Sequence, residues 1–216
     1  MTDNTANAPV SATAPVSLTK VMTAGERISL TKAHPGLTKL AIGMGWSPRR
    51  TAGKNFDLDA SCFLTTADGK VRNIQDMIYS YFLKTHASGA VVHSGDNTDG
   101  QGEGDDETLT VDLSLIPAEI QKLTFTCTIY AALCRGQNFG MVDDAYARLV
   151  DLTTGAELYR FDLSEDASTC NAVILVRLYR HDGGWKFEAV GQGFTGGMQE
   201  LCAQHGIQIE AETETE

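Results

Sequence analysis

Carboxylates and glycines are concentrated in residues 95–107, "GDNTDGQGEGDDE", which hold six carboxylates and four glycines in thirteen positions. Hard divalent ions such as calcium bind about six to eight oxygen atoms, partly from carboxylates and partly from backbone carbonyls. Glycine lets a backbone turn its carbonyls toward an ion without steric cost, as Gly102 and Gly104 would here. The stretch therefore predicts a loop that wraps a calcium ion, with a solvated acidic surface loop as the alternative.

A second group of carboxylates lies on a predicted strand, residues 55–64, "NFDLDASCFL". Apolar residues alternate along it, so Asp57 and Asp59 fall together on the opposite face. On one face of a strand these two carboxylates lie roughly 7 Å apart and repel each other unless a cation is shared. We therefore expect the strand and the acidic loop to contribute ligands to one site.

The acidic loop does not follow the EF-hand pattern. Counted from Asp96, Glu107 does fall at the twelfth position, but Gln101 occupies the sixth, where an EF-hand has glycine. No helical pattern flanks the loop on either side. The ligands must therefore come from a loop that strands support.

The remaining sequence is punctuated like that of an all-β protein, with Gly, Asp and Asn clustered between short alternating segments. Further strands are predicted over residues 16–20, 28–32, 40–46, 109–113, 123–129, 146–152, 157–163, 172–180 and 185–190. Short helices are predicted over residues 117–122 and 197–206. This order predicts an all-β fold, a β-sandwich of two mainly antiparallel sheets with a few short helices.

Length and charge limit the classes of function. The 216 residues suggest one domain over residues 16–209, with a flexible lead-in over 1–15 and an acidic tail over 210–216. A net charge of -11 argues against binding to nucleic acid or to an anionic membrane surface, because both are polyanions. No signal peptide and no membrane-spanning apolar stretch are apparent, so we expect a cytoplasmic protein that is not integral to a membrane.

The cysteines are odd in number and show no C-x-x-C spacing, which favours reduced thiols over disulfides or a zinc site. Buried, inert side chains are the simplest interpretation of these residues. A redox or metalloid-trapping role is the alternative. The five residues concerned are Cys62, Cys127, Cys134, Cys170 and Cys202.

Several motifs together resemble the TerD family of bacterial tellurium-resistance and stress proteins, from about residue 16 to residue 209. They are "GDN" followed by "GEGDDE", the "DLDAS" strand, "RGQNFG" at 135–140, "DLSEDAST" at 162–169 and "LYRHDGGWKFEAVGQGF" at 178–194. The resemblance implies a calcium-binding β-sandwich encoded in a stress operon, with other proteins of that operon as partners. It also implies a ligand set made of Asp57, Leu58, Asp59, Asp96, Asn97, Gly102, Gly104, Asp105, Asp106 and Glu107.

Three departures from the family pattern predict one bound ion per chain rather than two. Asn55 replaces the first aspartate of the strand motif, Tyr81 and Phe82 replace an asparagine pair, and residues 128–132 read "TIYAA". His93 precedes the "GDN" turn, so we expect it to orient that loop.

The sequence therefore predicts a calcium-binding module that acts in a stress response. We expect no enzymatic activity, because no nucleophile and base pair is in plain view. Two other functions stay open: a thiol-dependent metalloid-handling protein, and an interaction scaffold whose ion site is degenerate.

Overall fold

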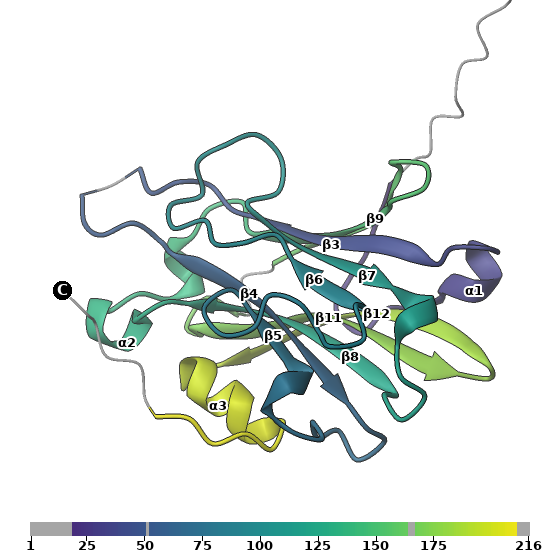
Figure 1. Ribbon diagram of the computed structural model, residues 1–216. Helices are drawn as coiled ribbons and strands as arrows, with labels where there is room; N and C mark the ends of the chain where they lie inside the picture. Colours follow the sequence, from purple (N-terminus) through teal and green to yellow (C-terminus); the bar gives the residue numbers. More distant parts are fainter. Residues whose placement is uncertain (1–18, 51, 164–166, 211–216) are drawn as a thin grey trace, which may run out of the picture.

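The protein forms a sandwich of two six-stranded sheets (Figure 1), described here from a computed structural model of residues 19–50, 52–163 and 167–210. Sheet A has the order β1 (Lys20–Val21), β10 (Glu157–Asp162), β9 (Tyr146–Asp151), β3 (Lys39–Gly45), β7 (Glu107–Asp112) and β6 (Val91–His93). Sheet B has the order β2 (Arg27–Ser29), β12 (Gly184–Phe194), β11 (Ala172–His181), β8 (Lys122–Ile129), β4 (Leu58–Thr65) and β5 (Met77–Tyr79).

Strand pairing is antiparallel throughout both sheets, apart from the parallel pair of β1 and β10. The predicted all-β sandwich of mainly antiparallel sheets is therefore confirmed. None of the helices among the described residues is long and apolar enough to cross a membrane.

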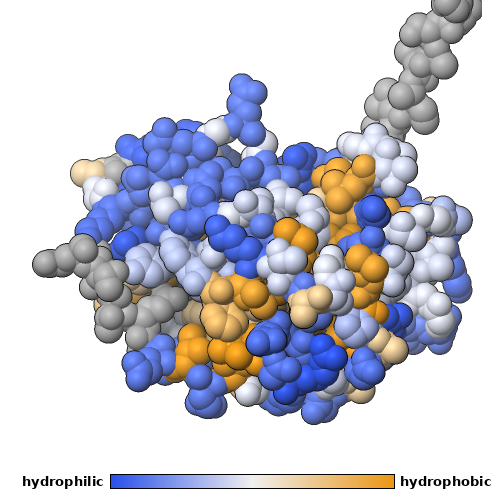
Figure 2. Space-filling model, viewed as in Figure 1, coloured by the Kyte–Doolittle hydropathy of each residue, from blue (hydrophilic) through white to orange (hydrophobic). Residues whose placement is uncertain are grey.

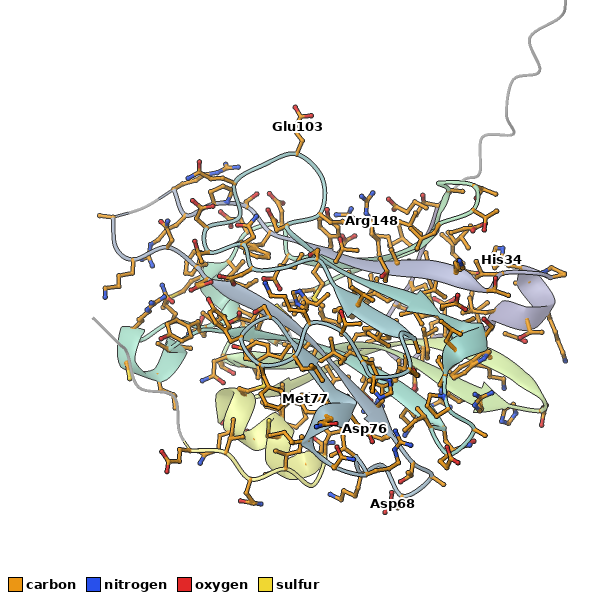
Figure 3. All side chains as sticks on the ribbon, viewed as in Figure 1. His34, Asp68, Asp76, Met77, Glu103 and Arg148 are labelled. Carbon is orange, nitrogen blue, oxygen red and sulfur yellow. The ribbon has the colours of Figure 1, made fainter. Side chains whose placement is uncertain are left out.

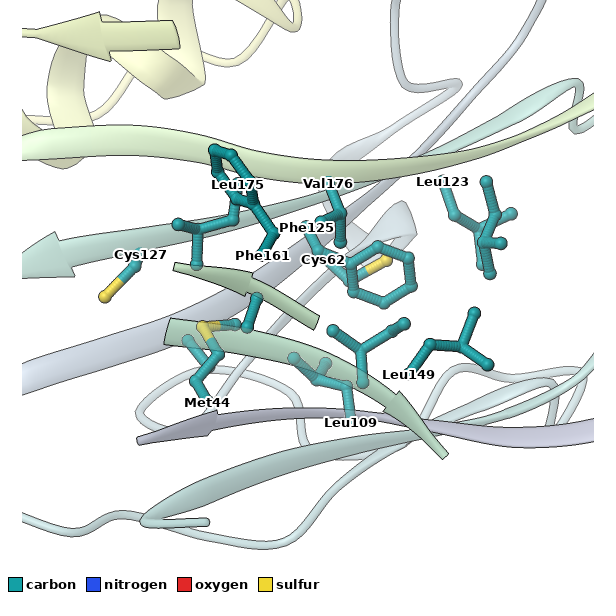
Figure 4. Close-up of a cluster of buried hydrophobic side chains, with 14 of the residues drawn as sticks. Met44, Cys62, Leu109, Leu123, Phe125, Cys127, Leu149, Phe161, Leu175 and Val176 are labelled. Atoms are coloured by element: carbon teal, nitrogen blue, oxygen red, sulfur yellow. The ribbon is translucent and has the colours of Figure 1, made fainter. Parts of the chain in front are cut away.

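The main core lies between the two sheets, where alternating residues of each strand meet (Figure 4). Strand β8 shows the pattern, since Leu123, Phe125, Cys127 and Ile129 are all buried in this core. The threonines between them are buried too, so the outer face of sheet B is covered over part of its area. A strand buried on both faces lies at the centre of a layered structure.

Helix α3 (Gly197–Gln204) provides that cover by packing on the outer face of sheet B. Its Met198, Leu201 and Cys202 form a second apolar cluster with Phe63 of β4 and Ile174 of β11. The other helical elements are short: α1 (Leu30–Ala33), η1 (Ile74–Asp76), η2 (Leu113–Leu115), α2 (Ala132–Arg135) and η3 (Phe139–Met141).

Two predicted elements are wrong. Residues 117–122 form a turn closed by Ile120 N–H donating to Pro117 O at 3.0 Å, and β8 begins at Lys122. The strand predicted over residues 28–32 ends at Ser29, and helix α1 begins at the next residue, Leu30. In both places the segment is only five or six residues long, and its pattern of polar and apolar residues cannot distinguish a turn, a helix and a strand.

Strands β5 and β6 and helix α2 were not predicted, because segments of three or four residues carry no measurable periodicity. The strand predicted over residues 16–20 lies mostly outside the described residues, and β1 begins at Lys20. The proposed lead-in and nearly all of the proposed tail also lie outside them.

Candidate metal centre

Three aspartates meet at one end of the sandwich. Asp57 directly precedes β4, Asp59 belongs to β4, and Asp96 belongs to the loop between β6 and β7. One carboxylate oxygen from each lies within 4.8 Å of the other two. Asp57 and Asp59 are 7% and 0% exposed, whereas Asp96 is exposed. We call this group the aspartate cluster.

The negative charge of the aspartate cluster shifts the pKa values of neighbouring side chains. The Tyr81 hydroxyl donates to Asp96 Oδ2 at 2.9 Å. Burial, this hydrogen bond and the charges of Asp59 and Asp57 raise the pKa of Tyr81 far above its ordinary value. Burial, together with the charges of Glu107 and Asp59, likewise raises the pKa of the Cys127 thiol. The cluster therefore favours positive charge and disfavours any new anion nearby.

The start of the acidic loop is fastened to strand β4 through Glu107. Glu107 is 1% exposed, and its Oε2 accepts a hydrogen bond from Ala60 N at 2.6 Å. Its Oε1 accepts from Asn97 N at 3.2 Å, directly beside Asp96. Asn97 in turn accepts hydrogen bonds from the amides of Asp99 and Gly100 through its Oδ1. Glu107 and Asn97 therefore hold Asp96 against the strand that carries Asp59.

His93 contributes to the same connection, which confirms the sequence prediction for this residue. Its Nδ1 accepts a hydrogen bond from Gly95 N at 3.0 Å, and its Nε2 lies 3.1 Å from Ala60 O. Because Nδ1 accepts, Nε2 carries the proton and donates to the carbonyl. The imidazole thus links the "GDN" turn to the backbone of β4.

Two of the predicted ligands are engaged with other partners. Asp105 Oδ1 accepts from Arg148 Nε at 2.7 Å and from the Tyr146 hydroxyl at 3.0 Å (Arg148 is labelled in Figure 3). Asp106 accepts from Trp46 N at 2.9 Å and from Asn97 Nδ2 at 3.0 Å. The three-aspartate grouping includes neither of them.

Burial raises the pKa of Asp106, against the opposing effect of the Trp46 hydrogen bond and with further upward effects from Asp105 and Asp99. A carboxylate in this environment binds a proton more readily than an isolated one. The charges of the loop therefore interact with one another beyond the aspartate cluster itself.

The predicted carbonyl ligands lie in the outer part of the loop. Gly102 and Gly104 have φ angles of 138° and 92°, which other residues rarely adopt. Gly104 O already accepts a hydrogen bond from the Tyr146 hydroxyl at 3.0 Å. Glu103, between the two glycines, points away from the molecule (Figure 3), and hydrophilic residues gather over this end (Figure 2). Leu58 is buried in the core, and because its side chain is a hydrocarbon only its backbone carbonyl could bind an ion.

Aromatic rings border the aspartate cluster at the positions that depart from the family pattern. The Tyr81 and Tyr130 rings stack with their centroids 6.3 Å apart, and Tyr130 N donates to Asp57 O at 2.8 Å. The sequence pattern marks Tyr81 only as a departure from an asparagine, whereas the fold gives it a hydrogen bond to Asp96. The signal was present in the sequence, since tyrosine carries a hydroxyl donor on a large ring.

A second buried polar group was also missed. Ser88 Oγ lies 2.8 Å from His86 Nδ1, and His86 Nε2 lies 3.1 Å from Asp76 Oδ1. Although this order resembles a hydrolase triad, Arg72 holds the same carboxylate with two hydrogen bonds of 2.8 and 2.7 Å. Ser88 Oγ also accepts from Ala90 N at 3.2 Å, which is the bonding of a serine turn. The group joins η1 to the chain that leads into β6.

The cysteines are all free, as the sequence predicts, but not all are buried. Cys62, Cys127 and Cys202 are buried, Cys170 is half-buried and Cys134 is exposed. Burial raises the pKa of Cys62 and Cys127, so both stay protonated and unreactive at neutral pH.

Comparison with known proteins agrees with the motifs of the sequence. A sequence model described as "TerD domain" matches residues 18–205. The chain is 48% identical over 192 residues to the tellurium resistance protein TerD of Serratia marcescens, covering 89% of this chain and 97% of that protein. It is 46% identical over 186 residues to the general stress protein 16U of Bacillus subtilis, covering 86% and 96%.

The fold is also similar to that of a solved structure. A homologue of the telluride resistance protein TerD from Streptomyces coelicolor superposes with a TM-score of 0.63 at 20% identity. The match covers 78% of this chain and 96% of that one. At this identity the likeness concerns the fold alone.

Proposed function

The chain belongs to the TerD family of tellurium-resistance and stress-response proteins, and from this premise we propose that it acts by binding a calcium ion at the aspartate cluster. The proposed role is binding rather than catalysis. We place it in the cytoplasm, where reduced cysteines are the rule, with other stress proteins of the same operon as partners.

The observation that supports this proposal is the approach of three carboxylates to within 4.8 Å of one another, two of them buried. Like charges at such distances raise the free energy of the folded chain unless a cation or a proton compensates them. An all-oxygen donor set suits hard cations rather than zinc or copper. Calcium suits it better than magnesium, because a strand and a glycine-rich loop do not present a tight octahedron.

Each residue of the site has a separate task in this proposal. Asp57, Asp59 and Asp96 would hold the ion, and a bound ion would offset the repulsion among their carboxylates. Glu107 and Asn97 position Asp96 against β4 through their hydrogen bonds. The ion would therefore tie an exposed loop to a buried strand of sheet B.

Calorimetric titration of the full chain with calcium tests the proposal. We expect saturable binding of one ion per chain, lost in Asp59→Asn. The matched control is Glu103→Gln, which removes one charge from the same loop at a side chain that points out of the molecule (Figure 3). Absence of saturable binding in the wild type would favour an interaction scaffold instead, and equal weakening by both variants would indicate general charge attraction.

A thiol-dependent function has weaker support. Cys134 is exposed, whereas the pKa values of Cys62 and Cys127 are raised by burial. Serine at all five cysteine positions is expected to preserve calcium binding. Loss of stress resistance in that variant, with calcium binding intact, would favour the thiol-dependent alternative.

A further inference from the structure

A polar pocket lies on the outer face of sheet B, at the end of β4 opposite to the aspartate cluster. It has a volume of about 170 Å³ and is lined by Thr65, Lys122, Thr124, Arg177, Gln204 and His205. In the register of the sheet, Thr65 pairs with Lys122, and Thr124 pairs with Arg177. Three neighbouring strands thus form its floor, and the end of α3 forms one wall. We call it the cationic pocket.

Arg177 is the central charge of the cationic pocket, and its hydrogen-bonding capacity is not filled. Its Nε is buried and has no hydrogen-bond partner among the described residues. Its nearest carboxylate oxygen, Glu188 Oε2, is 3.8 Å away from Nη1, beyond hydrogen-bond length. Glu188 Oε1 instead accepts a hydrogen bond of 2.8 Å from Arg27 Nε, and Arg27 Nη2 lies 2.8 Å from the same oxygen. A buried guanidinium donor left in this state is stabilised by any acceptor that reaches it.

Further positive charges converge on the same place. Burial lowers the pKa of His205, a hydrogen bond to Leu201 O opposes this, and the charges of Arg177, Lys70 and Lys122 lower it further. The imidazole therefore experiences three cations at once. In a chain with a net charge of -11, such a concentration of positive charge is local and not a property of the whole surface.

The negative groups around the cationic pocket are already occupied. Asp68 lines its rim, and Asp68 Oδ1 accepts from the Thr66 hydroxyl at 2.5 Å and from Lys70 N at 3.1 Å. The carbonyls at the end of α3 would repel an anion, but Leu201 O accepts from His205 Nδ1 at 2.7 Å and Gln204 O accepts from Lys70 Nζ at 2.6 Å. These hydrogen bonds leave Asp68 charged, but the charges of three cations, Arg177, Lys70 and Lys122, act at the same pocket, and Asp68 is the one carboxylate among its described lining residues.

We propose that the cationic pocket binds a small dianionic oxyanion, namely a phosphate group or an anion of the same shape. Arg177 would donate to it from the floor, Lys122 would supply a second charge, and the threonine hydroxyls would complete the contacts. Guanidinium and ammonium groups with hydroxyls are the usual donors for such anions. A volume of about 170 Å³ is large enough for one phosphate group.

Titration of the full chain with sulfate in the presence of calcium tests this site. Isothermal calorimetry gives the affinity, and NMR of the Arg177 Nε–H reports whether the anion reaches that atom. We expect saturable binding with a shifted Nε–H signal, and about tenfold weaker binding in Lys122→Gln and in Arg177→Gln. Titration of calcium-free protein with phosphate and with glycerol phosphate then distinguishes a free anion from a phosphate monoester, according to which binds more tightly.

The control is Lys186→Gln, because Lys186 is half-buried on β12 of the same sheet, paired with Tyr179, and does not line the pocket. This variant should bind within about twofold of the wild type. Equal weakening in Lys186→Gln and Lys122→Gln, or an unshifted Arg177 signal at saturation, would overturn the proposal. So would the absence of saturable binding. Lys122→Gln keeps the test informative if Arg177→Gln does not fold.

Discussion

Opposite ends of strand β4 carry opposite charges. Asp59 and Thr65 lie on the same face of this strand, six residues apart, so the aspartate cluster and the cationic pocket are separated by about 20 Å. Figure 3 shows the two ends through their outermost labels, Glu103 beyond the acidic loop and Asp68 at the rim of the pocket. The acidic end draws its charge from stretches that are acidic in sequence. The basic end assembles single residues from distant segments.

The two ends also differ in how their charges are compensated. At the basic end Glu188 lies near Arg177 and reduces its field, although it does not reach hydrogen-bond length. At the acidic end three carboxylates approach one another within 4.8 Å. We therefore expect the stability of the acidic end to depend on a bound cation more than the stability of the basic end depends on an anion. The following predictions are ordered from the largest expected effect to the smallest.

Asp76 is a useful comparison with the aspartate cluster, because its cationic partner is Arg72 of the same chain and not a bound ion. Asp76→Asn should lower the free energy of unfolding by about 3 kcal/mol, because it removes the charge of a buried carboxylate that Arg72 and His86 both contact, and calcium should not change that loss. Chemical denaturation with and without calcium measures it. The control is Asp68→Asn, at an exposed carboxylate. If the loss in Asp76→Asn depended on calcium, Arg72 would not be the cation that stabilises Asp76.

The same residue predicts a pH dependence. Burial would raise the pKa of Asp76, but hydrogen bonds from Arg72 and then from His86 outweigh it, so its pKa is lowered. A lowered pKa in the folded chain adds stability above the unfolded value of about 3.9, and this stability is lost as the pH falls through the folded pKa. The difference between wild type and Asp76→Asn should therefore shrink below about pH 4. A difference that stays constant down to pH 2 would rule out the ion pair as its source.

Removal of calcium should produce the next largest effect. An ion that binds only the folded chain, at about one hundred times its dissociation constant, adds about 2.7 kcal/mol, or about 5–10 °C in Tm for a chain of this size. Thermal unfolding in calcium and in excess chelator measures the shift. Magnesium at the same concentration should restore less of it. An unchanged Tm in chelator would mean that calcium does not stabilise the folded chain, despite the repulsion among the three carboxylates.

Double substitutions sharpen the boundary of the site. Asp57→Asn and Asp59→Asn should be coupled in the free energy of calcium binding, because each already spoils the shared coordination. Asp59→Asn and Asp105→Asn should add to within about 0.5 kcal/mol, since Asp105 pairs with Arg148. Calorimetric titration of the single and double variants measures both. Coupling of Asp105 as strong as that of Asp57 would place it in the coordination of the same ion.

The smallest effect on stability is expected at the basic end. Arg177→Met should change the free energy of unfolding by less than about 1 kcal/mol, because methionine fills a similar volume and removes a buried donor that has no hydrogen-bond partner among the described residues. Denaturation in phosphate-free buffer measures it. A loss of several kcal/mol would show that Glu188 compensates Arg177 more strongly than its distance suggests.

Sequence patterns predicted most of the strands, because alternation over six or more residues directly reflects one buried face. Strands β8 and β11 are examples, with ends within one or two residues of the prediction. The prediction for segments such as 117–122 is wrong, because the conformation of so short a segment depends on what packs against it and not on its own periodicity. The short edge strands β5 and β6 owe their conformation to pairing with β4 and β7.

In the candidate site, too, part of the arrangement can be predicted from the sequence and part depends on the fold. Asp57, Asp59 and Asp96 could be nominated from the sequence, because local charge density and alternation are properties of short contiguous stretches. Which carboxylates meet was decided only in the folded chain, where Glu107 fastens the loop to β4 and Arg148 holds Asp105 apart. The cationic pocket left no trace in the sequence at all. Its residues lie up to 140 positions apart, from Thr65 to His205, and only the register of three strands and the end of α3 bring their charges together.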